Sequence, residues 1–129
     1  MRKYSCYIPV ILILMSFCSL ILFRGSLTRY ASRIMTNGME PEEKSIVENI
    51  ISEQYDYSKN TKGYECTFLE FGSVGCNSCR QMESVMAEIK QKYSNRVKVV
   101  FINVSQKENR ELVDYFGIVT IPTQVLLDK

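Results

Sequence analysis

The sequence predicts an α/β fold, a central sheet flanked by helices, with one apolar helix before it. Two short runs rich in β-formers, residues 66–71 and 97–104, are each followed by a segment with helical signals. Strands that alternate with helices favour parallel pairing through right-handed crossovers. A stretch of 20 residues without a charge, residues 4–23, precedes this pattern. The chain is therefore expected to hold one small α/β domain and a separate N-terminal segment.

The composition limits the class of protein. A chain of 129 residues suffices for one small domain. Residues 1–33 hold five Lys/Arg and no acid, whereas residues 34–129 hold eleven Lys/Arg against fourteen Asp/Glu, a net charge of −3. Because binding to nucleic acid depends on a basic surface, we expect no nucleic-acid partner for this mildly acidic domain.

Residues 4–23 are long enough to hold the chain in a membrane. At ~1.5 Å per residue, a helix of this length spans the ~30 Å hydrocarbon core of a bilayer. A cleaved secretory signal is the alternative, but the apolar run exceeds the usual ~7–15 residues and no Ala-x-Ala-like cleavage site follows it. We expect an uncleaved anchor or signal-anchor over residues 1–24, in which Cys6 and Cys18 serve as small apolar residues.

The residues after the anchor change in character twice. Residues 25–39 contain Gly, Ser, Thr and Asn and predict a tether. The domain is expected to begin at residue 40 with a packed helix, because Pro41 suits the first helical position and acids fill the first turn. The polar residues 56–63 then predict a loop into the central strand.

The central strand is predicted over residues 66–71, between two glycines. A turn then leads to Cys76 and Cys79, which are expected on the first turn of a helix. The apolar residues of that helix recur at the helical period and form one stripe: Met82, Val85, Met86, Ile89 and Tyr93.

The placement of the two cysteines favours redox chemistry. A helix N-terminus carries about half a positive charge and unpaired N–H groups, which favour a thiolate over a neutral thiol. The i, i+3 spacing puts both sulfurs on one face, so Cys79 can attack a mixed disulfide formed at Cys76. Because Cys76 precedes the helix, we expect it to be more exposed and to act as the nucleophile, with Cys79 as the resolving thiol.

A Cys-x-x-Cys pair also occurs in metal sites. Zinc needs four ligands, whereas this chain has no histidine and only three further cysteines, Cys6, Cys18 and Cys66. We therefore expect no zinc site. A soft-metal module for copper is an open alternative, since a strand, a Cys-x-x-Cys and a helix occur there in the same order.

The second half of the domain continues the alternation. Residues 97–104 are nearly all apolar, which predicts an interior parallel strand covered on both faces. Ser105 and Glu108 have the spacing of a capping box, so a helix is expected to follow and to end at Gly117. A last strand is predicted within residues 118–127.

The last strand is entered through Ile-Pro-Thr at residues 121–123, 46 residues after the first cysteine when counted to the proline. With this motif the chain resembles the thioredoxin superfamily over about residues 64–129. Members carry a strand, a Cys-x-x-Cys at the head of a helix and an Ile-Pro-Thr, which correspond here to residues 68–71, 76–79 and 121–123. Together these three motifs are specific.

The resemblance implies further site residues. It implies that the bond before Pro122 is cis and lies against the active-site disulfide, and that Thr120, Ile121 and Pro122 contact the substrate. It also implies a buried carboxylate six residues before the first cysteine, which is Glu70 here. A buried Glu70 would accept the Cys79 proton, whereas an ordinary strand-end glutamate is the other interpretation.

The sequence departs from the family pattern at several positions. Gly75 replaces a tryptophan, Asn77-Ser78 replaces Gly-Pro, and Phe101 stands where members often place a lysine near the buried carboxylate. Members continue past the last strand with a further strand and a helix, so the resemblance leads us to expect a C-terminally incomplete domain over residues 40–129, without these two elements.

The resemblance implies a thiol–disulfide oxidoreductase that acts on protein disulfides or dithiols without a cofactor. A membrane electron-transfer partner would supply the electrons. Basic residues flank the anchor on both sides, so its orientation rests on the chemistry: structural disulfides occur outside the cytosol, and we expect an extracytoplasmic domain. A copper-binding module and a redox-inert, truncated remnant are the alternatives.

Overall fold

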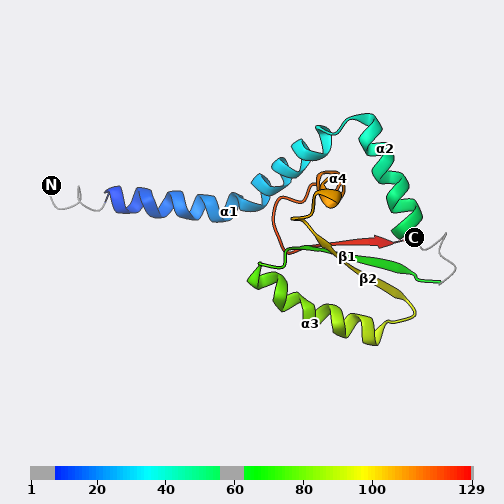
Figure 1. Ribbon diagram of the computed structural model, residues 1–129. Coiled ribbons are helices and arrows are strands. Elements are labelled where there is room, and N and C mark those ends of the chain that lie inside the picture. Colours follow the sequence, from blue (N-terminus) through cyan, green and yellow to red (C-terminus); the bar gives the residue numbers. More distant parts are fainter. Residues whose placement is uncertain (1–7, 56–62, 129) are drawn as a thin grey trace, which may run out of the picture.

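The computed structural model describes residues 8–55 and 63–128 (Figure 1). The loop expected over residues 56–63 lies outside the described residues except for Gly63, and so does Cys6. The chain forms the following elements in order: α1 (Ile8–Asn37), α2 (Pro41–Ile50), a π-helical turn (Ile51–Tyr55), β1 (Cys66–Gly72), α3 (Asn77–Lys92), β2 (Val97–Asn103), a 3-10 turn (Lys107–Asn109), α4 (Arg110–Tyr115) and β3 (Thr123–Asp128).

The three strands form one mixed sheet in the order β2-β1-β3. β1 pairs in parallel with β2 and antiparallel with β3, which puts Phe71 opposite Ile102 on one side and Thr123 on the other. The parallel connection runs through α3, as a parallel pair requires a crossover. The last four residues of β1 are all buried. The predicted α/β fold and its central strand are therefore confirmed, but the parallel pairing that the alternation favours holds only for β1 and β2, because β3 runs antiparallel to β1.

β2 differs from its prediction in one respect. Its apolar run predicts an interior strand, but β2 lies at an edge of the sheet that the described residues form, and only Ile102 is buried. The apolar run indicates only that the side chains of β2 favour burial. The position of a strand in the sheet depends instead on which other segments pair with it, and the run carries no information on that.

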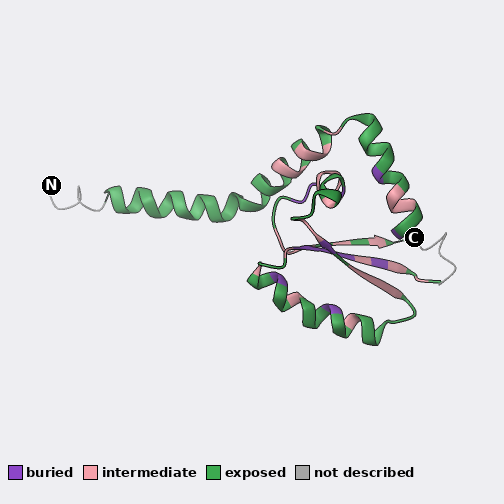
Figure 2. Cartoon of the chain, in the orientation of Figure 1, coloured by how far each residue is buried: buried purple, intermediate pink, exposed green. Residues whose placement is uncertain are grey.

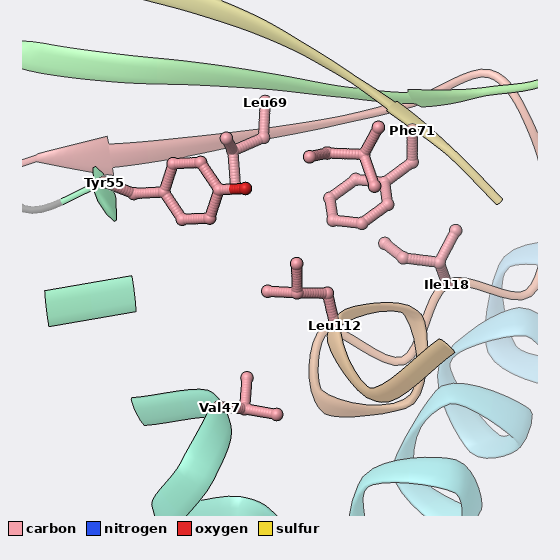
Figure 3. Packing of buried hydrophobic residues seen from close by; sticks show 7 residues of the cluster. Val47, Tyr55, Leu69, Phe71, Leu112 and Ile118 are labelled. Carbon is pink, nitrogen blue, oxygen red and sulfur yellow. The ribbon is translucent and has the colours of Figure 1, made fainter. Parts of the chain in front are cut away.

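The main core lies on one face of the sheet. Side chains alternate along a strand, so Leu69 and Phe71 point to the same side of β1. Both are fully buried against residues from α2, the turn after it, α4 and the loop beyond (Figure 3). These partners are Val47, Tyr55, Leu112 and Ile118. The helix predicted at Pro41 thus packs on this face.

α3 covers the opposite face of the sheet (Figure 1). Within its predicted stripe Met86 is buried, Met82 and Ile89 are half-buried, and Val85 and Tyr93 are exposed. The coverage is partial, because Phe101 of β2 and Leu126 of β3 are 41% and 63% exposed. The two faces of the sheet are therefore unequally covered.

The tether predicted over residues 25–39 is mostly helical. α1 continues to Asn37, and its last turns pack against α4 and the loop that follows α4. Ser32 lies against Gly117, and the Thr36 hydroxyl donates to the Tyr115 carbonyl at 3.4 Å. Serine and threonine disfavour helix only weakly and Gly25 costs about 1 kcal/mol relative to alanine, so packing on the domain overrides this composition. Only residues 38–40 separate α1 from α2.

The N-terminal part of α1 has no such contacts. Residues 8–30 are exposed throughout, including their many large apolar side chains (Figure 2). By length and composition α1 is able to cross a membrane, and a signal sequence would meet the same criteria.

The capping box predicted at Ser105 and Glu108 does not form. Instead a 3-10 turn leads into α4, and the Asn109 side chain donates to the Asn103 carbonyl at 2.9 Å. The Asn103 side chain accepts from the Ser105 N–H at 3.1 Å. Asparagine side chains compete for backbone groups as effectively as serine does, which shifts the start of the helix. Gly117 ends α4 with a positive φ of 58°, as predicted.

Candidate functional site

Cys76 and Cys79 form a disulfide at the start of α3, with their Cα atoms 5.2 Å apart. The chain leaves β1 at Gly72 and turns back on itself, so that the Cys76 N–H donates to the Ser73 carbonyl at 3.1 Å. Cys76 is the N-cap residue of α3, and its sulfur accepts the Cys79 N–H at 3.2 Å. The sulfur of Cys76 thus takes the place that a serine or aspartate oxygen takes at other helix starts.

The two sulfurs have different surroundings. Cys79 is 3% exposed and faces the sheet, whereas Cys76 is only half-buried. The Ser78 hydroxyl lies 3.2 Å from the Cys76 sulfur and is free to donate to it. Cys76 is therefore more exposed to solvent than Cys79, which agrees with its expected place before the helix.

Gly72 lets the disulfide lie directly against the end of β1. A Cβ at this position would lie 3.4 Å from the Cys79 sulfur and 2.8 Å from the ring of Phe101. The second distance is shorter than carbon atoms tolerate. Because Gly72 has no side chain, α3 approaches the sheet closely and brings Cys79 over the face that Phe101 and Glu70 share.

Glu70 is fully buried in the middle of this face. Its Oε2 accepts a hydrogen bond of 2.7 Å from the side-chain amide of Gln124, and its Oε1 has no hydrogen-bond partner among the described residues. Burial raises the pKa of the Glu70 carboxyl, and the Gln124 hydrogen bond opposes part of that rise. The structure thus places Glu70 as the buried carboxylate and not as an exposed strand-end residue.

Glu70, Phe101 and Gln124 form one row across the three strands. The register sets Glu70 opposite Phe101 on β2 and opposite Gln124 on β3. Paired residues share a face of the sheet, so the aromatic ring flanks the carboxylate on one side and the amide on the other. The sequence pattern did not single out Gln124, because only the antiparallel register of β3 brings it to Glu70.

The Ile121–Pro122 peptide bond is cis. Because Thr123 pairs with Phe71, this bond lies next to the C-terminal end of β1, which leads to the turn before Cys76. The Thr123 hydroxyl donates to the Thr120 carbonyl at 2.6 Å and closes the turn around the proline. Ile121 and Pro122 are half-buried, and Thr120 is exposed. Residues 120–122 and the disulfide therefore both lie near the C-terminal end of β1.

The remaining cysteines lie elsewhere. Cys66 is half-buried at the start of β1, and burial raises the pKa of its thiol. Cys18 is exposed on α1. Among the residues that the structure describes, no three His, Cys, Asp or Glu side chains are grouped so as to hold a metal ion.

Comparisons with known proteins agree with this geometry. The family model described as Thioredoxin matches residues 47–129. Thioredoxin of Alicyclobacillus acidocaldarius is 31% identical over 71 residues, which are 55% of this chain and 66% of that protein. Thioredoxin 1 of Synechococcus elongatus is 38% identical over 58 residues, which are 45% of this chain and 52% of that protein.

The chloroplastic thioredoxin-like protein HCF164 of Oryza sativa is 33% identical over 63 residues, 49% of this chain and 24% of that protein. The chain thus spans less than two thirds of the length of these curated relatives. The family model covers more than half of the chain and includes the disulfide, the buried glutamate and the cis-proline. The protein belongs to the thioredoxin family.

Proposed function

We propose that the protein is a thiol–disulfide oxidoreductase that exchanges disulfides with other proteins. The single observation that carries this proposal is the Cys76–Cys79 disulfide at the N-cap of α3. A disulfide between residues three apart on a helix start opens and closes without large movement of the backbone. The thioredoxin relatives support the same chemistry.

In the proposed reaction Cys76 acts first. In the reduced protein its thiolate attacks one sulfur of a substrate disulfide, which forms a mixed disulfide and releases the other substrate sulfur as a thiolate. Cys79 then loses its proton and attacks the Cys76 sulfur. The mixed disulfide breaks, the second substrate thiolate leaves, and the Cys76–Cys79 disulfide forms. Two electrons pass from the cysteine pair to the substrate, and the reverse sequence oxidises a dithiol.

The roles of the two cysteines follow from their positions. The half-buried Cys76 lies at the helix N-terminus, where the Cys79 N–H and the Ser78 hydroxyl are placed to stabilise a thiolate. The buried Cys79 is shielded from a bulky substrate but is already within bonding reach of Cys76. We assign Cys76 as nucleophile and Cys79 as resolving thiol.

Glu70 is the proposed acceptor of the Cys79 proton. It shares a sheet face with Cys79, which packs against Gly72 two residues further along β1. A carboxyl whose pKa is raised by burial is a better base than an exposed one when it is ionised. Its unpartnered Oε1 supplies the lone pair for this transfer.

Thr120, Ile121 and Pro122 are the proposed substrate contacts. They precede β3 near the C-terminal end of β1, where Cys79 lies against Gly72, and Pro122 has no N–H that would pair with its own chain. A substrate segment in extended conformation can lie along this turn with its disulfide over Cys76.

Residues 4–23 are proposed to anchor the domain, residues 40–129, to a membrane. Their length and the exposure of the apolar side chains of α1 support this assignment. We place the domain on the extracytoplasmic side, where disulfide exchange with secreted proteins has substrates, and we propose a membrane redox partner as electron source.

Reduction of insulin disulfides by the full chain in detergent, with dithiothreitol as electron donor, tests the proposal. We expect turnover that Cys76→Ser abolishes and that Cys66→Ser, the matched control outside the pair, leaves unchanged. A parallel copper(I) titration separates the alternative function. Absence of insulin reduction together with stoichiometric copper binding at Cys76 and Cys79 would replace this proposal with a metal-binding one.

A further inference from the structure

The hydrogen bond between Gln124 and Glu70 joins two strands inside the site. The Gln124 amide nitrogen lies 2.7 Å from Oε2 of Glu70, and the two residues are direct partners in the β1–β3 register. Glu70 is fully buried, and its other oxygen has no partner among the described residues. A buried, half-satisfied carboxylate costs free energy, so a feature of this kind suggests a function.

We propose that Gln124 is a positioning residue for proton transfer: its amide holds Oε2 of Glu70 and leaves Oε1 as the oxygen that takes the Cys79 proton. This inference rests on the proposed oxidoreductase function.

The arrangement of the sheet supports this assignment. The Phe101 ring reaches toward Gly72 on the other side of the row, so the side of the carboxylate away from Gln124 is apolar. An apolar wall offers no hydrogen-bond donor, and within the row only the Gln124 amide fixes the orientation of the carboxylate. Cys79 lies against Gly72 on this same face.

The Gln124 hydrogen bond can form both when Glu70 is ionised and when it is protonated. When Glu70 is ionised, the Gln124 N–H donates to a charged oxygen, which favours the ionised form. When Oε1 carries the proton from Cys79, Oε2 remains a carbonyl oxygen and still accepts the same N–H. The hydrogen bond is therefore kept throughout the step, and no side chain has to rotate. A lysine in this place would bring a positive charge, whereas the amide orients the carboxylate without one.

The experiment uses the full chain in detergent, in a background in which Cys6, Cys18 and Cys66 are serine. Three variants are compared with this background: Gln124→Leu removes the donor, Gln124→Lys adds a cation, and Gln91→Leu makes the same change at an exposed position of α3.

Two quantities are measured for the background protein and for each of the three variants. Infrared carboxyl titration, with Glu70→Gln as the reference for subtraction, reports the ionisation of Glu70. Stopped-flow release of thionitrobenzoate from a mixed disulfide at Cys76 reports the resolving step against pH.

We expect Gln124→Leu to raise the pKa of Glu70 and to slow resolution below neutral pH by roughly tenfold, since a hydrogen bond to a charged group is lost. The acidic limb of the pH–rate profile should move in the same direction as the carboxyl titration. Gln124→Lys should lower the pKa of Glu70 and move the acidic limb to lower pH. Gln91→Leu should change neither the pKa nor the acidic limb.

A carboxyl titration that does not respond to Gln124→Leu would overturn the inference and leave the oxidoreductase function intact. A titration that moves while the acidic limb stays in place would also overturn it, because Gln124 would then have only a structural role. If the background protein never releases the second thionitrobenzoate, the proposed function itself fails, and the titration still decides whether Gln124 controls the ionisation of Glu70.

Discussion

Ser32 of α1 and Gly117 after α4 lie in direct contact, although 85 residues separate them in the sequence. A Cβ on Gly117 would lie 2.8 Å from the Ser32 carbonyl oxygen, and Gly117 has a φ of 58°. The contact holds the C-terminal turns of α1 on the domain. Residues 31–37 of α1 thus belong to the packed part of the protein, whereas residues 8–30 extend away from it as an exposed helix.

Gly117→Ala is expected to lower the free energy of unfolding by more than the ~1–2 kcal/mol that a left-handed alanine costs, because the new methyl group also displaces α1. Gly63→Ala is the matched control, since Gly63 has a φ of 68° but open space around its Cβ position. Denaturant unfolding measures both losses, and hydrogen exchange reports the release of α1. Equal losses in the two variants, with α1 still protected, would show that the contact contributes nothing.

The two cysteines are expected to behave unequally. Cys76→Ser should abolish exchange, whereas Cys79→Ser should leave the first attack intact and accumulate a mixed disulfide with the substrate. Pro122→Ala in the Cys79→Ser background should lengthen the life of this complex, because the proline lies where the substrate is proposed to dock. Non-reducing electrophoresis detects the complex. If Cys76→Ser traps the substrate and Cys79→Ser does not, the two roles are reversed.

Glu70 is expected to destabilise the fold as the pH rises. Burial raises the folded-state pKa of its carboxyl above the unfolded value. At pH values between these two pKa values the folded state binds more protons than the unfolded state, so the free energy of unfolding falls as the pH rises. The total loss is ~1.4 kcal/mol for each pH unit by which the two pKa values differ. Glu70→Gln should therefore melt higher than the wild type at pH 8, and the difference should close toward pH 4.

Thermal melts between pH 4 and pH 8 measure this difference. Glu88→Gln, which removes an exposed carboxylate from α3, is the control for a change of net charge. A constant difference between Glu70→Gln and the wild type across the pH range would mean that Glu70 is not buried in solution.

Gly72→Ala and Phe101→Leu are expected to be coupled. The new methyl group would lie 2.8 Å from the edge of the Phe101 ring, and this partly exposed ring has to move aside. We expect Gly72→Ala alone to lower stability by ~1 kcal/mol and to lower it less when Phe101 is already leucine. A double-mutant cycle measured by urea unfolding gives the coupling energy. If the stability losses of the two substitutions are strictly additive, the Phe101 ring does not approach Gly72.

The protein is expected to stay with membranes after carbonate extraction, because residues 8–23 expose apolar side chains that water solvates poorly. The substitutions Leu12→Lys and Leu14→Lys should release it, since charges in the middle of the apolar run prevent insertion. Recovery of the unaltered protein in the soluble fraction, at the mass of residues 25–129, would show that the segment is a cleaved signal.

The sequence by itself determined the elements whose signals are local. The β-formers of residues 66–71, the helical stripe after Cys79 and the left-handed Gly117 depend on neighbours a few residues away, and each forms as predicted. The cysteine pair, the glutamate six residues before it and the Ile-Pro-Thr motif also identified the family, because they are read as fixed spacings along the chain.

Only the tertiary structure decided the features that depend on distant partners. Residues 25–37 are helical because Ser32 and Thr36 pack on a loop about 80 residues away, which outweighs their composition. β2 lies at an edge because no other described strand pairs with its outer side. Gln124 joins the site because an antiparallel register sets it opposite Glu70. Contacts across the chain leave no local pattern in the sequence, so the packing alone could show them.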